Sequence, residues 1–280
     1  MSIKVISLND ELAEIVQNER IKGKTVGFVP TMGALHQGHL SLIEACKKNA
    51  DFVICSIFVN PTQFNQTSDL DNYPRTLNSD LTQLAAVNCD LVYTPSIEEV
   101  YKNEAPINFD FAGLDLPMEG ANRPGHFEGV VRVVKRLFEI VQPDISCFGI
   151  KDFQQLAIIK HMVEFYQMPI EIISCPIIRE TSGLAMSSRN VRLSSEDVIA
   201  ALTLSKALKS IQLNSSMQNV EACLVAARKI LSENVELEYL EIADSNTLLA
   251  ATEWSSSNNL RAFVAARVGD VRLIDNMELT

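Results

Sequence analysis

Hydrophobic and polar positions follow two periods along the first 175 residues of the chain. Short runs rich in β-branched residues predict strands at 3–6, 25–29, 52–59, 90–93, 145–148 and 170–174. Segments with an apolar residue every three or four positions predict helices after residue 10 and at about 38–48, 80–86, 130–141 and 152–166. The sequence Ser7-Leu-Asn-Asp10 is typical of a capping box at the start of the first helix. Residues 103–128 are rich in Pro and Gly and predict loops.

The order of these elements predicts the fold class. Segment 52–59 is almost wholly apolar, as expected of a central parallel strand that is buried on both faces. Repeated strand–helix–strand units imply right-handed crossovers and a parallel sheet with helices on both of its faces. We therefore expect an α/β, Rossmann-like, doubly wound fold for the first part of the chain.

The pattern changes from about residue 180. Two helical segments, 195–210 and 217–232, are followed by strand-like runs at 237–242, 260–268 and 271–274. Helices followed by consecutive strands predict a smaller α+β domain. We expect domain boundaries at 1–180 and 181–280, with a hinge near residues 180–184.

Composition and charge narrow the possible functions. Apolar residues make up 47% and charged residues 21% of the 280 residues, which is ordinary for a globular protein. The net charge of −11 argues against a sequence-independent nucleic-acid surface, which needs Lys and Arg to replace counterions. No apolar run approaches the ~20 residues that span a bilayer, and the N-terminus lacks a secretory apolar region. The six cysteines include no CxxC pair, so we expect buried, reduced thiols in a cytoplasmic protein.

The first motif with candidate chemistry is His36-Gln-Gly-His39, between a predicted strand and a predicted helix. Parallel sheets bind ligands at the carboxyl ends of their strands, and a helix N-terminus favours phosphate. Gly33 and Gly38 permit close backbone approach. Side chains three positions apart lie on one helical face, so both imidazoles could donate to one phosphate. No GxGxxG follows the first strand, which disfavours a dinucleotide cofactor.

The second motif, Met186-Ser-Ser-Arg189, combines hydroxyl groups and a guanidinium near the predicted domain boundary. Such groups can hold a departing pyrophosphate, and motion between domains could bring them to a ligand. A pair of histidines alone can be a chance, solvated feature. Two phosphate-type motifs in one α/β chain rarely coincide, so the combination favours adenylyl transfer.

Residues 26–39 (VGFVPTMGALHQGH) resemble the nucleotidyltransferase signature that class I aminoacyl-tRNA synthetases share, and 186–189 is similar to their second signature. Over nearly its full length the chain resembles the pantoate–β-alanine ligase (pantothenate synthetase) family. The motifs that carry this resemblance are 59–64 (VNPTQF), 72–75 (NYPR), 119–127 (EGANRPGHF), 142–144 (QPD), 147–155 (CFGIKDFQQ), 187–190 (SSRN) and 273–276 (LIDN).

The resemblance implies a two-step reaction. Pantoate attacks the α-phosphorus of ATP to give pantoyl adenylate and pyrophosphate, and the amine of β-alanine then displaces AMP. The resemblance also implies a homodimer, and ATP that carries Mg²⁺ on its phosphates.

Carried over by position, the implied catalytic residues are His39, His36, Lys151 and Arg189. The implied pantoate ligands are Gln63 and Gln155, with Gln63 also facing β-alanine. The implied ATP ligands are Pro30, Thr31, Met32, Gly33, Ala34, Leu35, His36, Gln37, Gly38, His39, Gly149, Ile150, Lys151, Asp152, Ile178, Met186, Ser187, Ser188 and Arg189.

One position departs from the family pattern, which commonly has Glu where this chain has Ile150. The change is silent if only the backbone there touches the nucleotide. Two other interpretations remain open. One is a metallohydrolase using His36, His39 and His126 with a carboxylate, although no HExxH-type spacing occurs. The other is a nucleotide-sensing protein with a degraded site, which would bind ATP and form no AMP.

Overall fold

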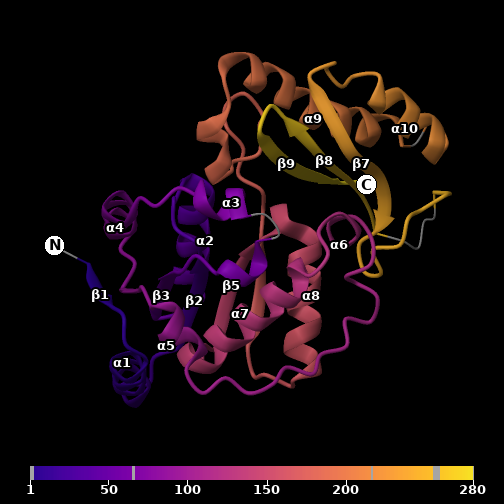
Figure 1. Cartoon of the computed structure of the whole chain (residues 1–280). Coiled ribbons are helices and arrows are strands. Elements are labelled where there is room, and N and C mark those ends of the chain that lie inside the picture. The colour runs from indigo at the N-terminus through magenta and orange to yellow at the C-terminus, as the bar shows by residue number, and fades with distance from the viewer. Residues whose placement is uncertain (1–2, 65–66, 216, 255–258, 280) are drawn as a thin grey trace. The chain divides into compact units, whose positions relative to one another are not determined.

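The structure is a computed structural model that describes residues 3–64, 67–215, 217–254 and 259–279. The chain divides into two compact units (Figure 1). The first unit comprises Met1–Asp115, Arg123–Ile150 and Gln155–Pro176, and the second comprises Leu116–Asn122, Lys151–Gln154 and Ile177–Thr280. Two short pieces from the middle of the chain, 116–122 and 151–154, therefore belong to the C-terminal unit.

The first unit is built on a parallel sheet, with six strands among the described residues, in the order β1-β4-β3-β2-β5-β6. The chain adds strands to one side of β2 and then continues on its other side with β5. The sheet therefore has its topological switch point between β2 and β5, where doubly wound folds bind ligands. The strands are β1 (Lys4–Ile6), β2 (Val26–Thr31), β3 (Phe52–Ile57), β4 (Leu91–Tyr93), β5 (Ile145–Gly149) and β6 (Glu171–Cys175).

Helices cover both faces of this sheet because neighbouring strand residues point to opposite sides. Phe28 and Ile54 pack into one apolar cluster with α1, α7 and α8, whereas the adjacent Val29 and Cys55 pack into another with α2 and α4. The helices of the first unit are α1 (Asn9–Ile21), α2 (Gln37–Lys47), α3 (Thr67–Asp71), α4 (Leu77–Ala86), α5 (Ile97–Tyr101), α7 (His126–Val141) and α8 (Phe153–Phe165), with 3₁₀ turns η1 (Pro61–Gln63) and η2 (Ile150–Asp152). The last two residues of η2 and the first two residues of α8 belong to the second unit.

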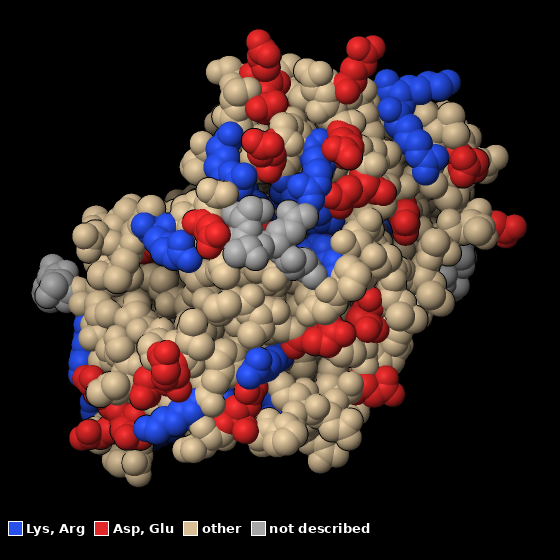
Figure 2. Space-filling view, in the orientation of Figure 1, with Lys and Arg blue, Asp and Glu red and all other residues tan. Residues whose placement is uncertain are grey.

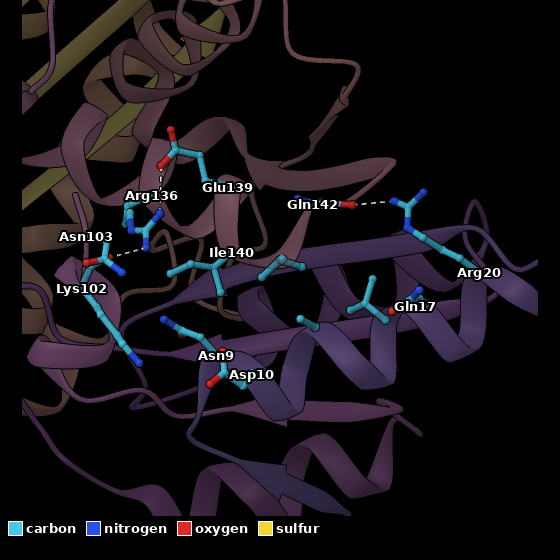
Figure 3. Close-up of a pocket in the computed structure, with 13 residues that line it drawn as sticks. Asn9, Asp10, Gln17, Arg20, Lys102, Asn103, Arg136, Glu139, Ile140 and Gln142 are labelled. Carbon is cyan, nitrogen blue, oxygen red and sulfur yellow. Dashed lines mark hydrogen bonds and ion pairs between the residues drawn. The ribbon is translucent and has the colours of Figure 1, made fainter. Parts of the chain in front are cut away.

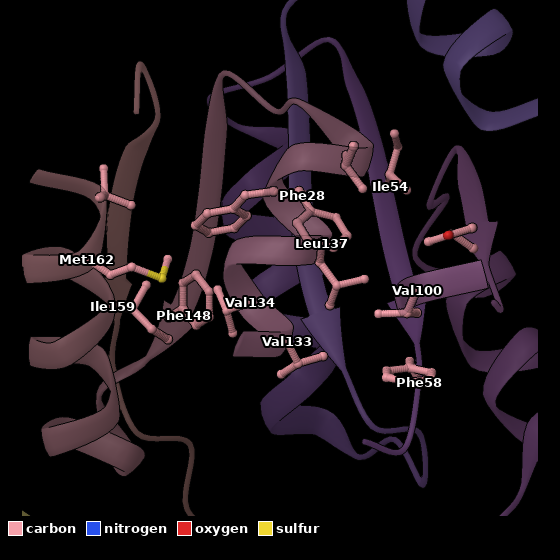
Figure 4. Close-up of a cluster of buried hydrophobic side chains, with 14 of the residues drawn as sticks. Phe28, Ile54, Phe58, Val100, Val133, Val134, Leu137, Phe148, Ile159 and Met162 are labelled. Atoms are coloured by element: carbon pink, nitrogen blue, oxygen red, sulfur yellow. The ribbon is translucent and has the colours of Figure 1, made fainter. Parts of the chain in front are cut away.

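The core on the α7 side is mainly aromatic and β-branched (Figure 4). Phe138 meets Phe28 and Phe148 edge to face, each with ring centroids 6.3 Å apart. Such pairs contribute ~0.5–1.5 kcal/mol beyond the apolar area they bury. This packing fixes β2 and β5 side by side, and it is their ends that carry the predicted site.

The second unit contains an antiparallel sheet in the order β7-β8-β9, formed by β7 (Val235–Asp244), β8 (Leu260–Val268) and β9 (Val271–Glu278). Helices α9 (Ser195–Asn214) and α10 (Val220–Arg228) pack with β8 in one apolar cluster. The unit also holds α6 (Glu119–Asn122) and the 3₁₀ turn η3 (Ser188–Arg192). Ser194 caps α9 through a reciprocal capping box with Asp197.

The predicted fold class is confirmed: a doubly wound parallel sheet accompanies a smaller unit with an antiparallel sheet. The predicted capping box at 7–10 is wrong. Helix α1 starts after Leu8, which has no polar side chain to cap it, and the Ser7 hydroxyl lies instead 3.1 Å from the Thr94 hydroxyl. Segment 103–128 is less uniform than predicted, since it contains α6 and the start of α7.

No described helix is long and apolar enough to cross a membrane.

Candidate active site

The loop after β2 is fixed by the buried carboxylate of Asp80 on α4. Asp80 accepts hydrogen bonds from the backbone N–H groups of Ala34 at 3.0 Å and Leu35 at 2.9 Å. Gly33 and Ala34 have positive φ angles of 82° and 49°. A Cβ atom on Gly33 would lie 3.0 Å from Ile57 and 3.1 Å from the Asp80 carboxylate, so glycine suits both the dihedral and the space. The loop therefore reaches α2 in one defined conformation.

His36 and His39 lie together at the start of α2, as their spacing predicted. Their ring centroids are 4.1 Å apart, and both rings are half-buried. His36 is the N-cap: its Nδ1 accepts from the N–H of Gly38 at 3.1 Å. The Nδ1 of His39 in turn accepts from the N–H of His36 at 3.3 Å. The pair forms a capping box built from imidazoles.

This capping geometry decides the tautomer of both rings. A neutral imidazole carries one N–H donor and one acceptor. Because each Nδ1 accepts a backbone N–H, the proton of each neutral ring lies on Nε2. Both rings are therefore N–H donors at Nε2, beside a helix N-terminus that carries partial positive charge. The arrangement suits an anion.

The other side of the switch point is the end of β5. Gly149 is its last residue, and the half-buried Ile150 begins η2. The Ile150 side chain packs against the apolar cluster that includes Phe148 and Leu156. The residue that departs from the family pattern is thus engaged in core packing.

Gln63 lies on η1 and contacts the loop after β2. Its Nε2 donates to the Met32 sulfur at 2.8 Å, which brings a predicted pantoate ligand against a predicted ATP ligand. Asn60 caps η1 by accepting from the Thr62 N–H at 3.2 Å and donates to the Gly129 carbonyl at 3.1 Å. Tyr101 donates to Asn60 Oδ1 at 2.7 Å. The predicted placement of Gln63 in a loop after a buried strand agrees with this geometry.

His126 supports η1 from the first turn of α7. Arg123 Nη1 lies 3.0 Å from its Nε2, and its Nδ1 lies 2.8 Å from the Gln63 carbonyl oxygen. Because Arg can only donate, Nε2 of His126 accepts and Nδ1–H donates to Gln63. Both ring nitrogens are used in this way, which contradicts the interpretation of His126 as a metal ligand. Among the described residues no three His, Cys, Asp or Glu side chains gather in a possible metal site.

Gln155 is a half-buried residue of α8 within the first unit. Its neighbour Gln154, which the sequence analysis did not single out, is 4% exposed and belongs to the second unit. Lys151 is half-buried and makes no ion pair within the described residues, and Asp152 is exposed.

In the second unit the predicted residues Ile178 and Met186–Arg189 lie in and just after a small hairpin. Met186 N–H donates to the Ile178 carbonyl at 3.0 Å, and Arg179 pairs with Ala185 across an antiparallel bridge. Ser187 caps η3, its hydroxyl accepting from the N–H of Arg189 at 3.3 Å. Ser188 and Arg189 then begin η3.

All six cysteines are free and buried, as predicted. Burial raises the pKa of Cys89 to about 12 and the pKa of Cys55 well above its usual value. These thiols therefore stay protonated at neutral pH and form part of the core.

A groove of about 480 Å³ lies elsewhere on the first unit, beside α1 and α7 (Figure 3). Its two arginine side chains bond to backbone carbonyls: Arg136 donates to the Lys102 and Val100 carbonyls, each at 2.7 Å, and Arg20 donates to the Gln142 carbonyl at 2.5 Å. These guanidinium groups hold the ends of α5 and α7. On the face shown in Figure 2, Lys and Arg are interspersed with Asp and Glu.

Fold and geometry together define a class: a doubly wound α/β protein with two paired histidines at the start of the helix that follows β2, beside its switch point. The sequence matches the family profile described as Pantoate-beta-alanine ligase over residues 4–278. It is 44% identical over 278 residues to pantothenate synthetase of Bacteroides fragilis, covering 99% of both chains. It is 43% identical over 269 residues to pantothenate synthetase of Porphyromonas gingivalis, covering 95% of this chain and 96% of the relative.

Solved structures of the same family also superpose on this chain. Pantothenate synthetase of Thermus thermophilus superposes with a TM-score of 0.92 at 39% identity, covering 99% of each chain. Pantoate-beta-alanine ligase of Francisella tularensis, complexed with beta-gamma ATP and beta-alanine, superposes with a TM-score of 0.81 at 36% identity, covering 99% of this chain and 97% of that one. The chain belongs to the pantoate–β-alanine ligase family and is a ligase.

Proposed function

We propose that this chain condenses (R)-pantoate with β-alanine at the expense of ATP, through a pantoyl-adenylate intermediate. The observation that carries the proposal is the pair of Nε2–H donors on His36 and His39 at the β2–β5 switch point. A related ligase has been solved as a complex with beta-gamma ATP and beta-alanine, which supports the same substrates here.

In the first step a carboxylate oxygen of pantoate attacks the α-phosphorus of ATP. A new P–O bond forms as the bond to pyrophosphate breaks, and the leaving oxygen takes the electron pair. Charge builds on the α-phosphoryl oxygens, where fixed donors stabilise the transition state most. His36 and His39 would donate to these oxygens. Lys151, Ser187, Ser188 and Arg189 would neutralise and hold the departing pyrophosphate.

In the second step the amine nitrogen of β-alanine attacks the acyl carbon of pantoyl adenylate. The C–N bond forms, the acyl C–O bond breaks, and AMP leaves with the electron pair while the nitrogen gives up a proton. We assign pantoate to Gln63 and Gln155, and β-alanine to Gln63. Neutral amides can both donate and accept, so they bind the substrate hydroxyl and carboxylate without the tight ion pair that would weaken the attacking oxygen.

The remaining ATP contacts are proposed along the loop after β2 and the end of β5. Backbone groups of residues 30–39 and 149–152 would bind the nucleotide, with Ile178 and Met186 from the second unit. Mg²⁺ would enter on the ATP phosphates, since it keeps several waters and takes few protein ligands.

We further propose a cytoplasmic homodimer that acts on small molecules rather than on nucleic acid. The six free buried thiols support a reducing compartment. The net charge of −11 disfavours binding to a polyanion.

The deciding experiment follows exchange of labelled pyrophosphate into ATP. We expect exchange that requires pantoate and proceeds without β-alanine, and AMP release once β-alanine is added. ATP binding with no exchange in folded protein would favour the degraded-site interpretation instead. His161→Ala is a suitable control, because His161 lies outside the site and contacts the Asp110 carbonyl at 2.9 Å. It should exchange at the wild-type rate.

A further inference from the structure

Two adjacent residues of β9, Asp275 and Asn276, are polar and almost fully buried. Their exposed fractions are 6% and 2%. A polar side chain at this depth is costly unless its hydrogen bonds are satisfied. Their partners lie in two separate segments of the second unit, and each segment carries proposed ATP ligands.

Asn276 is bonded to the segment that carries Lys151. Its Nδ2 donates to the Lys151 carbonyl at 2.9 Å, and its Oδ1 accepts from Arg261 Nη1 at 2.8 Å. The Arg261 guanidinium lies over the Phe153 ring, 4.4 Å from its centroid. The Phe153 ring also meets Phe263 of β8, with centroids 5.7 Å apart. Residues 151–153 are therefore attached to β8 and β9 at three points.

Asp275 is bonded to the segment that leads to Arg189. Its carboxylate receives two hydrogen bonds from the Arg179 guanidinium, at 2.6 and 2.9 Å. Arg179 Nη1 also donates to the Gly183 carbonyl at 3.1 Å, which closes the turn of the hairpin. The two anchoring residues are bonded to each other, since the Asn276 N–H donates to Asp275 Oδ1 at 2.8 Å. The chain runs directly from this hairpin into Ser187–Arg189.

We propose that Asp275 and Asn276 are positioning residues, which fix the Lys151 segment and the Arg189 segment to the same strand. They act through those two cations and contact no substrate. The inference rests on the proposed function, in which Lys151 and Arg189 bind the triphosphate. It also explains why residues 151–154 cluster with the C-terminal unit.

A second buried network of the same unit provides a matched comparison. Glu119 accepts from the Tyr239 hydroxyl at 2.8 Å and from two nitrogens of Arg272 at 2.7 and 2.8 Å. This network holds residues 116–122, where we propose no ATP ligand. Loss of a hydrogen bond in this network should destabilise the second unit about as much as loss of one at Asn276. It should leave the positions of Lys151 and Arg189 unchanged.

The first test compares Asn276→Asp with Tyr239→Phe in the pantoate-dependent pyrophosphate exchange. Asn276→Asp keeps the acceptor for Arg261 and removes the donor to Lys151. We expect exchange turnover to fall ~10- to 100-fold, the scale of a lost supporting contact. Tyr239→Phe should stay within about twofold. If the Asn276→Asp variant has a lowered melting temperature, Asn276→Ala removes the donor to Lys151 without adding charge, together with the acceptor for Arg261, and its turnover is measured instead. An unchanged rate in a folded Asn276 variant would overturn the inference.

The second test repeats the substitution in a Lys151→Ala background. If Asn276 acts through Lys151, its substitution should have little effect once the Lys151 side chain is gone. We therefore expect the double variant to lose less than about threefold in exchange turnover relative to Lys151→Ala. If the fold-loss of the double variant equals the product of the two single-variant losses in turnover, Asn276 does not act through Lys151. If Lys151→Ala alone exchanges at the wild-type rate, the proposed role of Lys151 is wrong, which is a different result from additive losses.

Asp275 is tested by the same design. Asp275→Asn removes one acceptor from Arg179, and we expect it to raise the KM for ATP in the wild-type background. In an Arg189→Ala background that increase should largely disappear. An equal increase in both backgrounds would remove Asp275 from the inference.

Discussion

The Asp80 carboxylate accepts the backbone N–H of Ala34 at 3.0 Å, which joins α4 to the loop that leads into the histidine pair. The same carboxylate accepts from Leu35 and, at 3.1 Å, from the Thr76 hydroxyl. Asp80 is 1% exposed, so water cannot replace it as an acceptor. The conformation of the loop is thus maintained from a residue far along the chain.

We expect Asp80→Asn to weaken this loop. The amide offers one acceptor oxygen in place of two, and one backbone N–H would lose its bond at a cost of ~1–3 kcal/mol. The melting temperature should fall, and pyrophosphate exchange should fall with it because the imidazoles lose their fixed position. Thermal melts and exchange rates measure the two effects. Exchange at the wild-type rate would mean that the loop holds its conformation without Asp80.

A second prediction concerns the helix position that faces η1. A Cβ atom on Gly129 would lie 2.4 Å from the Thr62 carbonyl oxygen and 2.8 Å from the Gln63 Cα. Gly129→Ala must therefore displace η1, with an overpacking cost of ~1–3 kcal/mol. We expect the KM for pantoate to rise, since Gln63 moves with the turn. Glu128→Ala, at an exposed position of the same helix, is the control and should match the wild type.

The histidine pair allows substitutions that separate its two roles. His39→Asn can keep an acceptor for the His36 N–H, because its side-chain oxygen lies about where Nδ1 does, but it removes the distal donor. We expect a melting temperature close to wild type with exchange turnover reduced ~10²–10³-fold, the usual loss for one transition-state donor. A reduction of less than about tenfold would make the capping bond the main role of His39.

A prediction of pH dependence comes from Glu104 and Arg132 in the first unit. Two hydrogen bonds from Arg132, at 2.7 and 2.5 Å, lower the pKa of Glu104 below its usual value. A carboxylate with a lowered pKa stabilises the fold above its unfolded-state pKa, and this contribution is lost as pH falls through the folded-state pKa. The pair is partly exposed, so we expect Glu104→Gln to cost at most ~1 kcal/mol at pH 7. Urea unfolding at pH 7 and near pH 3 should show the difference at the higher pH and not at the lower one.

The sequence predicted those parts of the site that follow from local order along the chain. His36, His39 and Gln63 lie in the segments that follow the buried strands β2 and β3, and strand ends of a parallel sheet meet at one edge. Asp80, Asn60 and Asn276 were not predicted as supports. Their partners are backbone groups of other segments, and a backbone partner leaves no pattern in the sequence. The sequence predicted that this helix starts at residue 80, whereas α4 starts at Leu77. The added first turn of the helix carries Asp80, whose partners are backbone groups of the loop after β2.

Gly129 illustrates the same limit in another way. Within a helical pattern an isolated glycine indicates only a weak point of the helix. Its role as the place where η1 approaches the helix backbone follows from packing of segments more than sixty positions apart, as the Asn60 bond to the Gly129 carbonyl shows.

The last prediction concerns Ile150, where the resemblance to the family leads us to expect Glu. The Ile150 side chain packs against the core of the first unit, so we expect the nucleotide to meet only its backbone. Ile150→Glu should then leave the dissociation constant for ATP within about threefold, because no side-chain contact to the nucleotide is gained or lost. It should also lower stability, since a carboxylate placed against apolar neighbours costs ~1–3 kcal/mol. Isothermal titration with ATP and thermal melts separate the two effects. A tenfold gain in ATP affinity would show instead that the side chain at this position reaches the nucleotide.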